Sequence, residues 1–461
     1  MGIYAAERSK MLVNIKPFIA LYSAILLLTT GSGLLGTYIG LRLSMEGLSS
    51  QMTGLIMTAY FVGATAGAFF CRPMIRRVGH IRAFTVFAAL LTGVTMCHGM
   101  YLSPLLWLLL RFLGGVATTG LYTVVESWLN ECADVSVRGR VFSVYMVMTY
   151  MGTAVGQKLL GVGDVQTQTL FLVAGTFIVF SIIPISSTKG IHPRLPSRES
   201  RSLSTICRRA PLGLLGCFAA GIMQSGFYAM GPVFAHEIGL GVDQLSWFMA
   251  VVLVGGLLFQ WPVGLISDRV DRSLMLPVLG LCIAGAAGLI LKFHGGIFML
   301  LGGSFFLGGF LFTLYPVAVA RTHDLFDAED VVKVSSVLLV VYGVGSILGP
   351  LSASTVITWM DTPYGFFYFF TGVALVYSVV SYVVRRKESV QIVSPEDQVD
   401  FVIMKETAQV AFHMDPRQDA DEEESAEVPP EAEDPGMEPA PSPEESVSPP
   451  VTPLEVAPVR Q

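Results

Sequence analysis

LYTVVESWLNECADVSVRGR, residues 121–140, begins as an apolar helical segment and ends in a short charged turn. The apolar part continues a run that starts near residue 105, and about 20 residues of this kind cross the core of a bilayer. Glu126 lies inside that run, about one helical turn before the charges begin. A carboxyl group in such a place needs a partner, a proton or a function. The surroundings of this helix therefore decide both the fold and the role of Glu126.

The composition is that of a membrane protein that crosses the bilayer many times. Of the 461 residues, 52% are hydrophobic and 14% are charged, and the mean hydropathy is +0.62. Soluble domains carry about 25% charged residues. Twelve apolar runs long enough to span a bilayer are predicted at 17–41, 52–71, 83–102, 105–130, 140–160, 168–187, 211–235, 244–266, 274–293, 296–320, 334–357 and 364–384. We therefore expect an all-α fold of twelve transmembrane helices in two six-helix halves.

The charge divides the chain into parts. Residues 1–387 carry 26 Lys and Arg against 16 Asp and Glu, whereas residues 388–461 carry 3 against 19, which together give the net charge of −6. We expect an N-terminal half at 1–187, a basic linker at 188–210 and a C-terminal half at 211–387. The tail at 388–461 is acidic and rich in proline, which predicts disorder over most of its length.

The basic residues also predict the orientation. With the N-terminus in the cytoplasm, the cytoplasmic segments hold 22 Lys and Arg, and the other side holds only Arg42, Lys158 and Lys292. Cytoplasmic loops of membrane proteins carry such an excess. Both termini and the linker are therefore expected in the cytoplasm, and the protein is expected in the inner (plasma) membrane.

The two halves show signs of duplication. Tyr122 and Tyr315 are 193 residues apart, and the same offset relates two glycines of the fifth span to two of the eleventh, Gly152 and Gly156 to Gly345 and Gly349. Parallel repeats of this kind place a substrate site between the halves, near the middle of the membrane. The glycines themselves form small-residue faces that favour close helix packing.

Several other classes of function find no support. The chain has no P-loop motif, and no nucleophile motif accompanies the apolar spans, so we expect neither an ATP-driven pump nor an enzyme. Its six cysteines form no C-x-x-C pair and no spacing with histidine that predicts a metal site, so no metal or cofactor is expected. No basic stripe is interleaved with exposed aromatic residues, which argues against nucleic-acid binding. We expect a monomer whose partners are the lipid bilayer and a small-molecule substrate.

The sequence resembles the major facilitator superfamily over about residues 15–387, and within it the YcaD-type branch of bacterial transporters. The narrower resemblance lies in RFLGGVATTGLYTVVESWLNE at 111–131, RGRVFSVYM at 138–146, GQ at 156–157, QWPVGLISDR at 260–269 and FTLYPVA at 312–318. It implies a transporter that alternates between two access states and does not identify the substrate.

GLISDRVDR at 264–272 resembles the loop motif of this superfamily, G-x-x-x-D-R-x-G-R. The resemblance implies that Gly264 admits a neighbouring helix and that Asp268 and Arg269 belong to a latch that stabilises one access state. The matching loop of the first half holds Arg76 and Arg77, with Arg76 where the superfamily has Asp. These loops could equally serve as basic anchors at the cytoplasmic surface.

Arg111, in RFLGG, resembles the R-x-x-x-G motif of the fourth helix and lies about 9 Å along its span. It could face a cavity, where it would bind an anionic group or influence a carboxyl group, or it could extend to the outer interface. Glu126 is too far along the same helix to contact it. Glu126 could join a network with Arg138, Arg140 and the loop arginines, exchange protons with the cavity, or contact the substrate directly. Glu131 and Arg138 match the E-x₆-R-G spacing found between helices four and five in the superfamily.

Polar and aromatic residues in helices that face the cavity in this superfamily are the candidates for substrate contacts. They are Tyr38, Tyr122, Gln224, Tyr228 and Tyr315. His98 is expected to be structural. The sequence thus predicts a secondary transporter, in which proton coupling would centre on Glu126. The alternatives are an uncoupled uniporter and a non-transporting scaffold or sensor that acts through the acidic tail.

Overall fold

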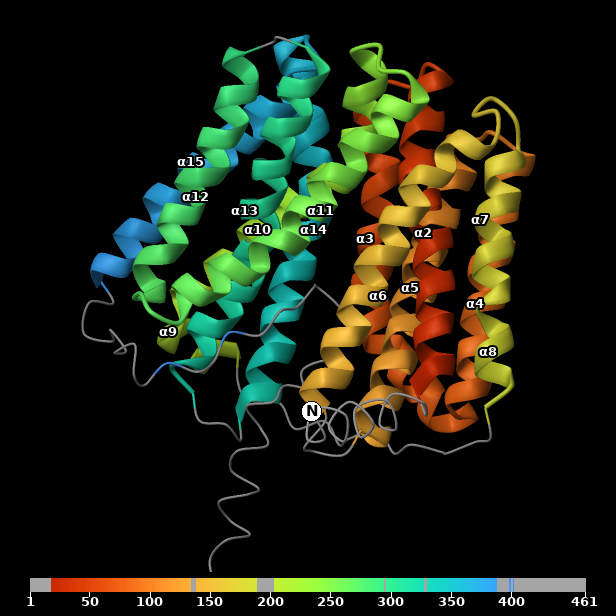
Figure 1. Ribbon diagram of the computed structural model, residues 1–461, viewed down its shortest axis with the longest axis horizontal. Helices are drawn as coiled ribbons and strands as arrows, with labels where there is room; N and C mark the ends of the chain where they lie inside the picture. The colour runs from red at the N-terminus through yellow and green to blue at the C-terminus, as the bar shows by residue number, and fades with distance from the viewer. Residues whose placement is uncertain are drawn as a thin grey trace, which may run out of the picture. The chain divides into compact units, whose positions relative to one another are not determined.

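The structure is a computed structural model, shown in Figure 1. It describes residues 18–133, 138–188, 203–293, 296–326 and 330–387, together with Gln398 and Phe401. Every regular element within these ranges is a helix.

The first half contributes six membrane crossings. Its helices are α2 (Ile19–Met45), α3 (Ser50–Val78), α4 (His80–Met100), α5 (Pro104–Cys132), α6 (Arg138–Lys158), the short 3-10 helix η3 (Leu159–Val162), α7 (Thr169–Phe180) and α8 (Ile182–Ser186). The predicted span at 168–187 is divided into α7 and α8, which meet at Ser181.

The second half begins with a short helix and then repeats the pattern. Its helices are α9 (Leu203–Arg209), α10 (Pro211–Glu237), α11 (Val242–Ser267), α12 (Arg272–Lys292), α13 (Ile297–His323), α14 (Val331–Met360) and α15 (Gly365–Lys387). We call the end of the bundle where α8 ends and α10 begins the linker end, and the other end the distal end. In Figure 1 the linker end is at the bottom.

Residues with special backbone geometry or polar side chains set the ends of these helices. Ser49 accepts a hydrogen bond from the backbone amide of Met52 and so caps the start of α3. Gly79, at φ 84°, ends α3 and lets α4 start at the next residue. Asp271 caps α12 in the same way as Ser49, by accepting from the amide of Ser273.

Eleven of the described spans are long and apolar enough to cross a membrane. The twelfth crossing is α6, which is less apolar because it carries polar residues such as Thr153 and Gln157 on a face that lines an internal cavity. The expected fold of twelve transmembrane helices in two six-helix halves is therefore confirmed.

The halves use the same helix pairs. In the first half α2 packs along α6 and α3 along α5; in the second half α10 packs along α14 and α11 along α13. A methyl group on Gly152 would overlap Thr29 of α2, and one on Gly349 would overlap Ser225 of α10. Gly156 and Gly345 are enclosed in the same two contacts, against α2 and α10. The duplication thus appears as equivalent close helix pairs.

The two halves are tied together at the distal end. Ser44 Oγ lies 2.8 Å from Nδ1 of His236, and Ser50 donates to Glu237 at 3.2 Å. Between α6 and α11, the Lys158 ammonium lies 2.7 Å from Asp243 Oδ1. These contacts join the ends of α2, α3 and α6 to those of α10 and α11.

Candidate functional site

A cavity of about 260 Å³ lies at the interface between the halves. Its walls come from α2, α3, α4, α5 and α6 of the first half and from α10 and α14 of the second. Because both halves contribute to its wall, relative movement of the halves would change access to it.

The wall of the cavity combines aromatic side chains with a few cationic or polar ones. Tyr60 and Tyr122 come from the first half, and Tyr228 and Tyr342 come from the second. The ionisable residues on the wall are Arg72, His98 and Arg111, besides these tyrosines. Among the described residues that line it, none is Asp or Glu.

Arg111 lies on α5 and is almost completely buried, with 6% of its surface exposed. Its guanidinium carbon is 4.4 Å from the centre of the Tyr60 ring on α3, a cation–π contact. Four residues further on, a methyl group on Gly115 would overlap the Tyr60 carbonyl, so the motif R-x-x-x-G brings α3 and α5 together beside Arg111. The structure therefore places Arg111 at the cavity wall instead of at the outer interface.

His98, on α4, is 2% exposed and lies between the rings of Trp107 and Phe171. Its Nδ1 donates to the Val94 carbonyl at 2.8 Å, which fixes the proton on that nitrogen because a carbonyl only accepts. His98 is thus packed as a structural residue and also forms part of the cavity wall.

Glu126 is fully buried in α5 and accepts a hydrogen bond of 2.7 Å from the Tyr145 hydroxyl of α6. Tyr122 and Thr123, one turn before it, line the cavity, whereas Glu126 itself does not. The carboxyl group is therefore next to the cavity and joins α5 to α6.

Two of the five predicted cavity residues, Tyr122 and Tyr228, line the cavity, and three do not. Tyr38 was expected to face the cavity, but it lies outside the cavity wall. Its hydroxyl donates to the carbonyls of Val165 and Thr167 and so ties α2 to the segment before α7.

Gln224 and Tyr315, the other two residues expected to face the cavity, also lie outside its wall. Gln224 accepts from the Tyr342 hydroxyl at 3.0 Å and donates to Leu311, and the Tyr315 ring packs on Tyr342 with centroids 5.1 Å apart. Both therefore support Tyr342, the residue that does reach the cavity. Tyr150 precedes Tyr342 by 192 residues but does not line the cavity, so the repeat gave no signal for Tyr342.

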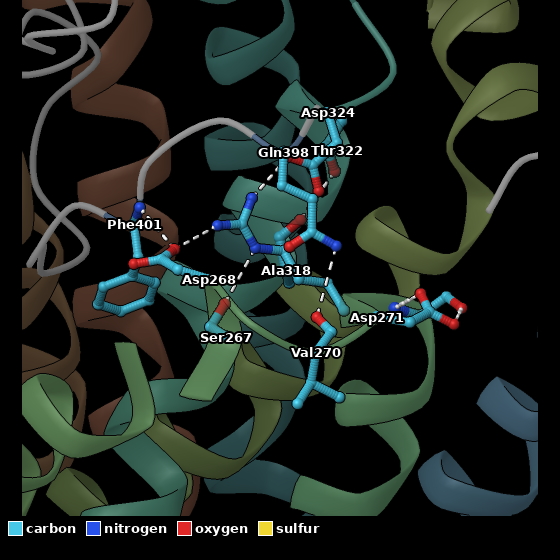
Figure 2. Close-up of polar contacts among 11 residues, drawn as sticks. Ser267, Asp268, Val270, Asp271, Ala318, Thr322, Asp324, Gln398 and Phe401 are labelled. Carbon is cyan, nitrogen blue, oxygen red and sulfur yellow. Dashed lines mark hydrogen bonds and ion pairs between the residues drawn. The ribbon is translucent and has the colours of Figure 1, made fainter. Parts of the chain in front are cut away.

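The loop between α11 and α12 forms a second polar cluster, shown in Figure 2. Arg272 Nη2 lies 2.7 Å from Asp268 Oδ1, its Nη1 pairs with Asp324 Oδ1, and its Nε donates to Ser267 Oγ at 2.9 Å. The arginine that pairs with Asp268 is thus Arg272. Arg269, which we expected in this latch, lies three residues earlier and is exposed.

Residues beyond the last helix also reach this loop. The backbone amide of Phe401 donates to Asp268 Oδ1 at 3.0 Å, and Gln398 donates to the Val270 carbonyl at 3.4 Å (Figure 2). The Phe401 ring covers Gly264, where a methyl group would lie 2.5 Å from the ring. Gly264 therefore admits the Phe401 ring, where we expected a neighbouring helix.

The remaining predicted charges lie at the linker end. Arg76, Arg77 and Arg140 are exposed. Glu131 lies in the last turn of α5 and Arg138 begins α6, but their side chains are outside the described part of the chain. Tyr145 is one partner of Glu126 in the structure.

The fold agrees with the comparisons with known proteins. The family model of the Major Facilitator Superfamily matches residues 21–241 and 213–417. The chain belongs to the major facilitator superfamily. A relative from Escherichia fergusonii, named uncharacterized MFS-type transporter YcaD, is 30% identical over 347 residues, covering 74% of this chain and 88% of the relative.

Solved structures of this superfamily share the fold. A mutant of the nucleoside transporter NupG aligns with a TM-score of 0.68 at 12% identity, covering 80% of this chain and 99% of that one. A bacterial homologue of the human lysosomal transporter Spinster, inward-facing and unoccupied, aligns with a TM-score of 0.61 at 14% identity, covering 84% and 98%. This superfamily member is thus a multi-pass membrane transporter.

Proposed function

We propose that this protein is a secondary transporter that moves a small molecule through the cavity between its halves by alternating access. The observation that carries the proposal is the combination of a cavity walled by both halves with contacts between the halves at the distal end. Rocking of one half against the other would break those contacts and expose the cavity at that end.

The distribution of basic residues supports an orientation in which the linker end faces the cytoplasm, and we propose the same side for both termini. The distal contacts then close this state toward the outside. Lys158 and Asp243 belong to the outer closure of this state, and they must separate during each transport cycle.

Glu126 is the group that we assign to proton coupling. It is buried, one turn from the cavity residue Tyr122, and it bonds to Tyr145 on the neighbouring helix. A buried carboxyl group that gains and loses a proton as its surroundings change can link a proton gradient to transport. Tyr145 lies on α6 and Glu126 on α5, so their hydrogen bond would respond to movement of α6 against α5.

The test begins with a thermal-shift screen of metabolites on the purified full-length protein, since a ligand at 100 times its Kd stabilises the folded state by about 2.7 kcal/mol. Hits are then measured in proteoliposomes for uptake driven by a pH gradient and for exchange without a gradient. We expect Glu126→Gln to abolish gradient-driven accumulation and to retain exchange.

Tyr145→Phe is the matched variant, because it keeps the carboxyl group and removes only its hydrogen bond. We expect it to retain accumulation with a shifted pH dependence. If wild type and Glu126→Gln both equilibrate the compound without regard to the gradient, the protein is a uniporter and Glu126 is structural.

A further inference from the structure

We infer that the cavity takes a small organic anion with an apolar or aromatic body, and that Arg111 binds its carboxylate or phosphate group. The inference rests on the proposed function and adds the chemical class of the substrate. Its first support is charge: Arg72 and Arg111 are both on the wall, and no Asp or Glu of the described chain lines it.

Among the described residues that line the cavity, none gives Arg111 an anionic partner. The cation–π contact with Tyr60 offsets only part of the cost of burying a guanidinium group in a membrane protein. Its Nε is buried, and no acceptor among the described residues receives a hydrogen bond from it. A carboxylate or phosphate would supply both the missing acceptors and the missing charge.

Arg111 is also held in a fixed position. The close contacts of Gly63 with Phe112 and of Gly115 with Tyr60 bring the backbones of α3 and α5 together on either side of it. A side chain that is already ordered loses little entropy when it binds. This rigid placement is typical of a binding group.

The other hydrogen-bonding groups on the wall are largely occupied. Four hydroxyl groups donate to carbonyls of their own helices; they belong to Thr118, Thr123, Thr153 and Ser346. Gln157 binds both Thr37 and the Gly33 carbonyl. These four hydroxyl groups therefore offer no donor to a sugar or another polyhydroxyl compound. One wall hydroxyl, Ser32 Oγ, has no hydrogen-bond partner within the described chain, so the charge of Arg111 is what favours an anion.

His98 supplies another polar atom with no hydrogen-bond partner among the described residues. Its Nε2 is buried and has no hydrogen-bond partner within the described chain. In the neutral ring this nitrogen accepts, since Nδ1 carries the proton. A hydroxyl or amide hydrogen on the ligand would satisfy it.

The position of the two arginines gives the anion a path. Arg111 lies about 10 Å from the distal start of α5, and Arg72 lies about 9 Å from the linker end of α3. Between them the wall is formed largely by aromatic and small side chains, including Tyr60, Tyr122 and Tyr228. Positive charge toward the linker end would attract an anion, and the aromatic rings would pack on its apolar body.

The test uses matched pairs of anions and neutral analogues on the purified full-length protein. The pairs are benzoate with benzamide, phenylacetate with phenylacetamide, succinate with succinamide, and phenyl phosphate with phenol. Binding is measured by thermal shift and calorimetry, and transport is measured as exchange in proteoliposomes. We expect at least one anion to bind at least about tenfold more tightly than its neutral partner.

Arg111→Gln should reduce this affinity by at least about tenfold, and Arg111→Lys should reduce it less because it keeps the charge. Arg82→Gln, at an exposed position on α4, removes one positive charge elsewhere and should leave it unchanged. Size-exclusion profiles show whether each variant is folded, and the lysine variant tests the inference if the glutamine variant is unstable.

The outcomes separate this inference from the proposed function. A neutral compound that is bound and exchanged as well as its anion, or anion binding that survives Arg111→Gln, would overturn the inference and leave a transporter. An anion that binds through Arg111 and is never exchanged would support the site and contradict transport. Failure of all four anions to bind would overturn the inference directly.

Discussion

Arg272 and Asp324 form an ion pair in which neither side chain is exposed to solvent. The pair joins the start of α12 to the residue that follows α13. Asp268 shares the same guanidinium group and is 37% exposed. Removal of Asp324 would leave the buried guanidinium group with the partly exposed Asp268 and with Ser267, and the loss of a buried charged partner is costly.

We therefore expect Asp324→Ala to lower the free energy of unfolding by about 2–3 kcal/mol. The measurement is an SDS titration of the protein in mixed micelles. The control is Asp243→Ala, which breaks the exposed pair with Lys158 and should cost about 1 kcal/mol or less. Equal losses in the two variants would show that burial of the pair does not determine its contribution.

The paired glycines give a second prediction. Gly152→Ala and Gly349→Ala would push α6 away from α2 and α14 away from α10, and each should cost about 1–3 kcal/mol. Gly288→Ala on α12 meets no atom within 4 Å and should be neutral or slightly stabilising, since alanine favours helix. The same titration compares the three, and a neutral Gly152→Ala would show that α2 and α6 separate at little cost.

The fold could be predicted from the sequence because a span depends on local composition. Even α6, whose hydropathy is low, was predicted at 140–160 because polar turns bound it on both sides. The cavity could be predicted only in part. Tyr38 and Tyr122 are similar residues in similar apolar helices, and only the rotation of each helix about its axis turns Tyr122 toward the cavity.

The loop cluster shows the same limit at closer range. Arg269 and Arg272 both follow Asp268, and both match an arginine of the superfamily motif, so the motif does not choose between them. The structure selects Arg272 because it begins α12 and lies four residues after Asp268, within reach of Asp324. Contacts with Phe401, more than 130 residues away, depend on tertiary structure.

A third prediction concerns Phe401. Phe401→Ala removes the ring that covers Gly264 and leaves the backbone bond to Asp268, so we expect a loss of about 1 kcal/mol. Gln398→Ala removes an exposed hydrogen bond of 3.4 Å and should change stability by less than about 0.5 kcal/mol. Both are measured by SDS titration of the full-length chain. An unchanged stability in Phe401→Ala would show that this ring adds nothing to the loop.

The fourth prediction tests the closure at the distal end. Gly54 of α3 faces α14, where a methyl group would lie 2.6 Å from Ser354 Cβ and 2.9 Å from the Pro350 carbonyl. Gly54→Leu cannot fit in this contact, so the distal ends of the halves should move apart and the open population should rise. Spin labels at Met45 and Leu240, in a background without the six native cysteines, report the distance between the halves by pulsed electron resonance.

We expect a longer distance to gain population in Gly54→Leu, because overpacking of a close helix contact is relieved by separation. Gly372→Leu is the matched control: it adds the same side chain on α15, where no atom lies within 4 Å, and should leave the distances as in wild type. If Gly54→Leu keeps the wild-type distances and unfolds more readily, the distal contact is a rigid part of the fold. A shift in Gly54→Leu alone would identify the contact as one that opens during alternating access.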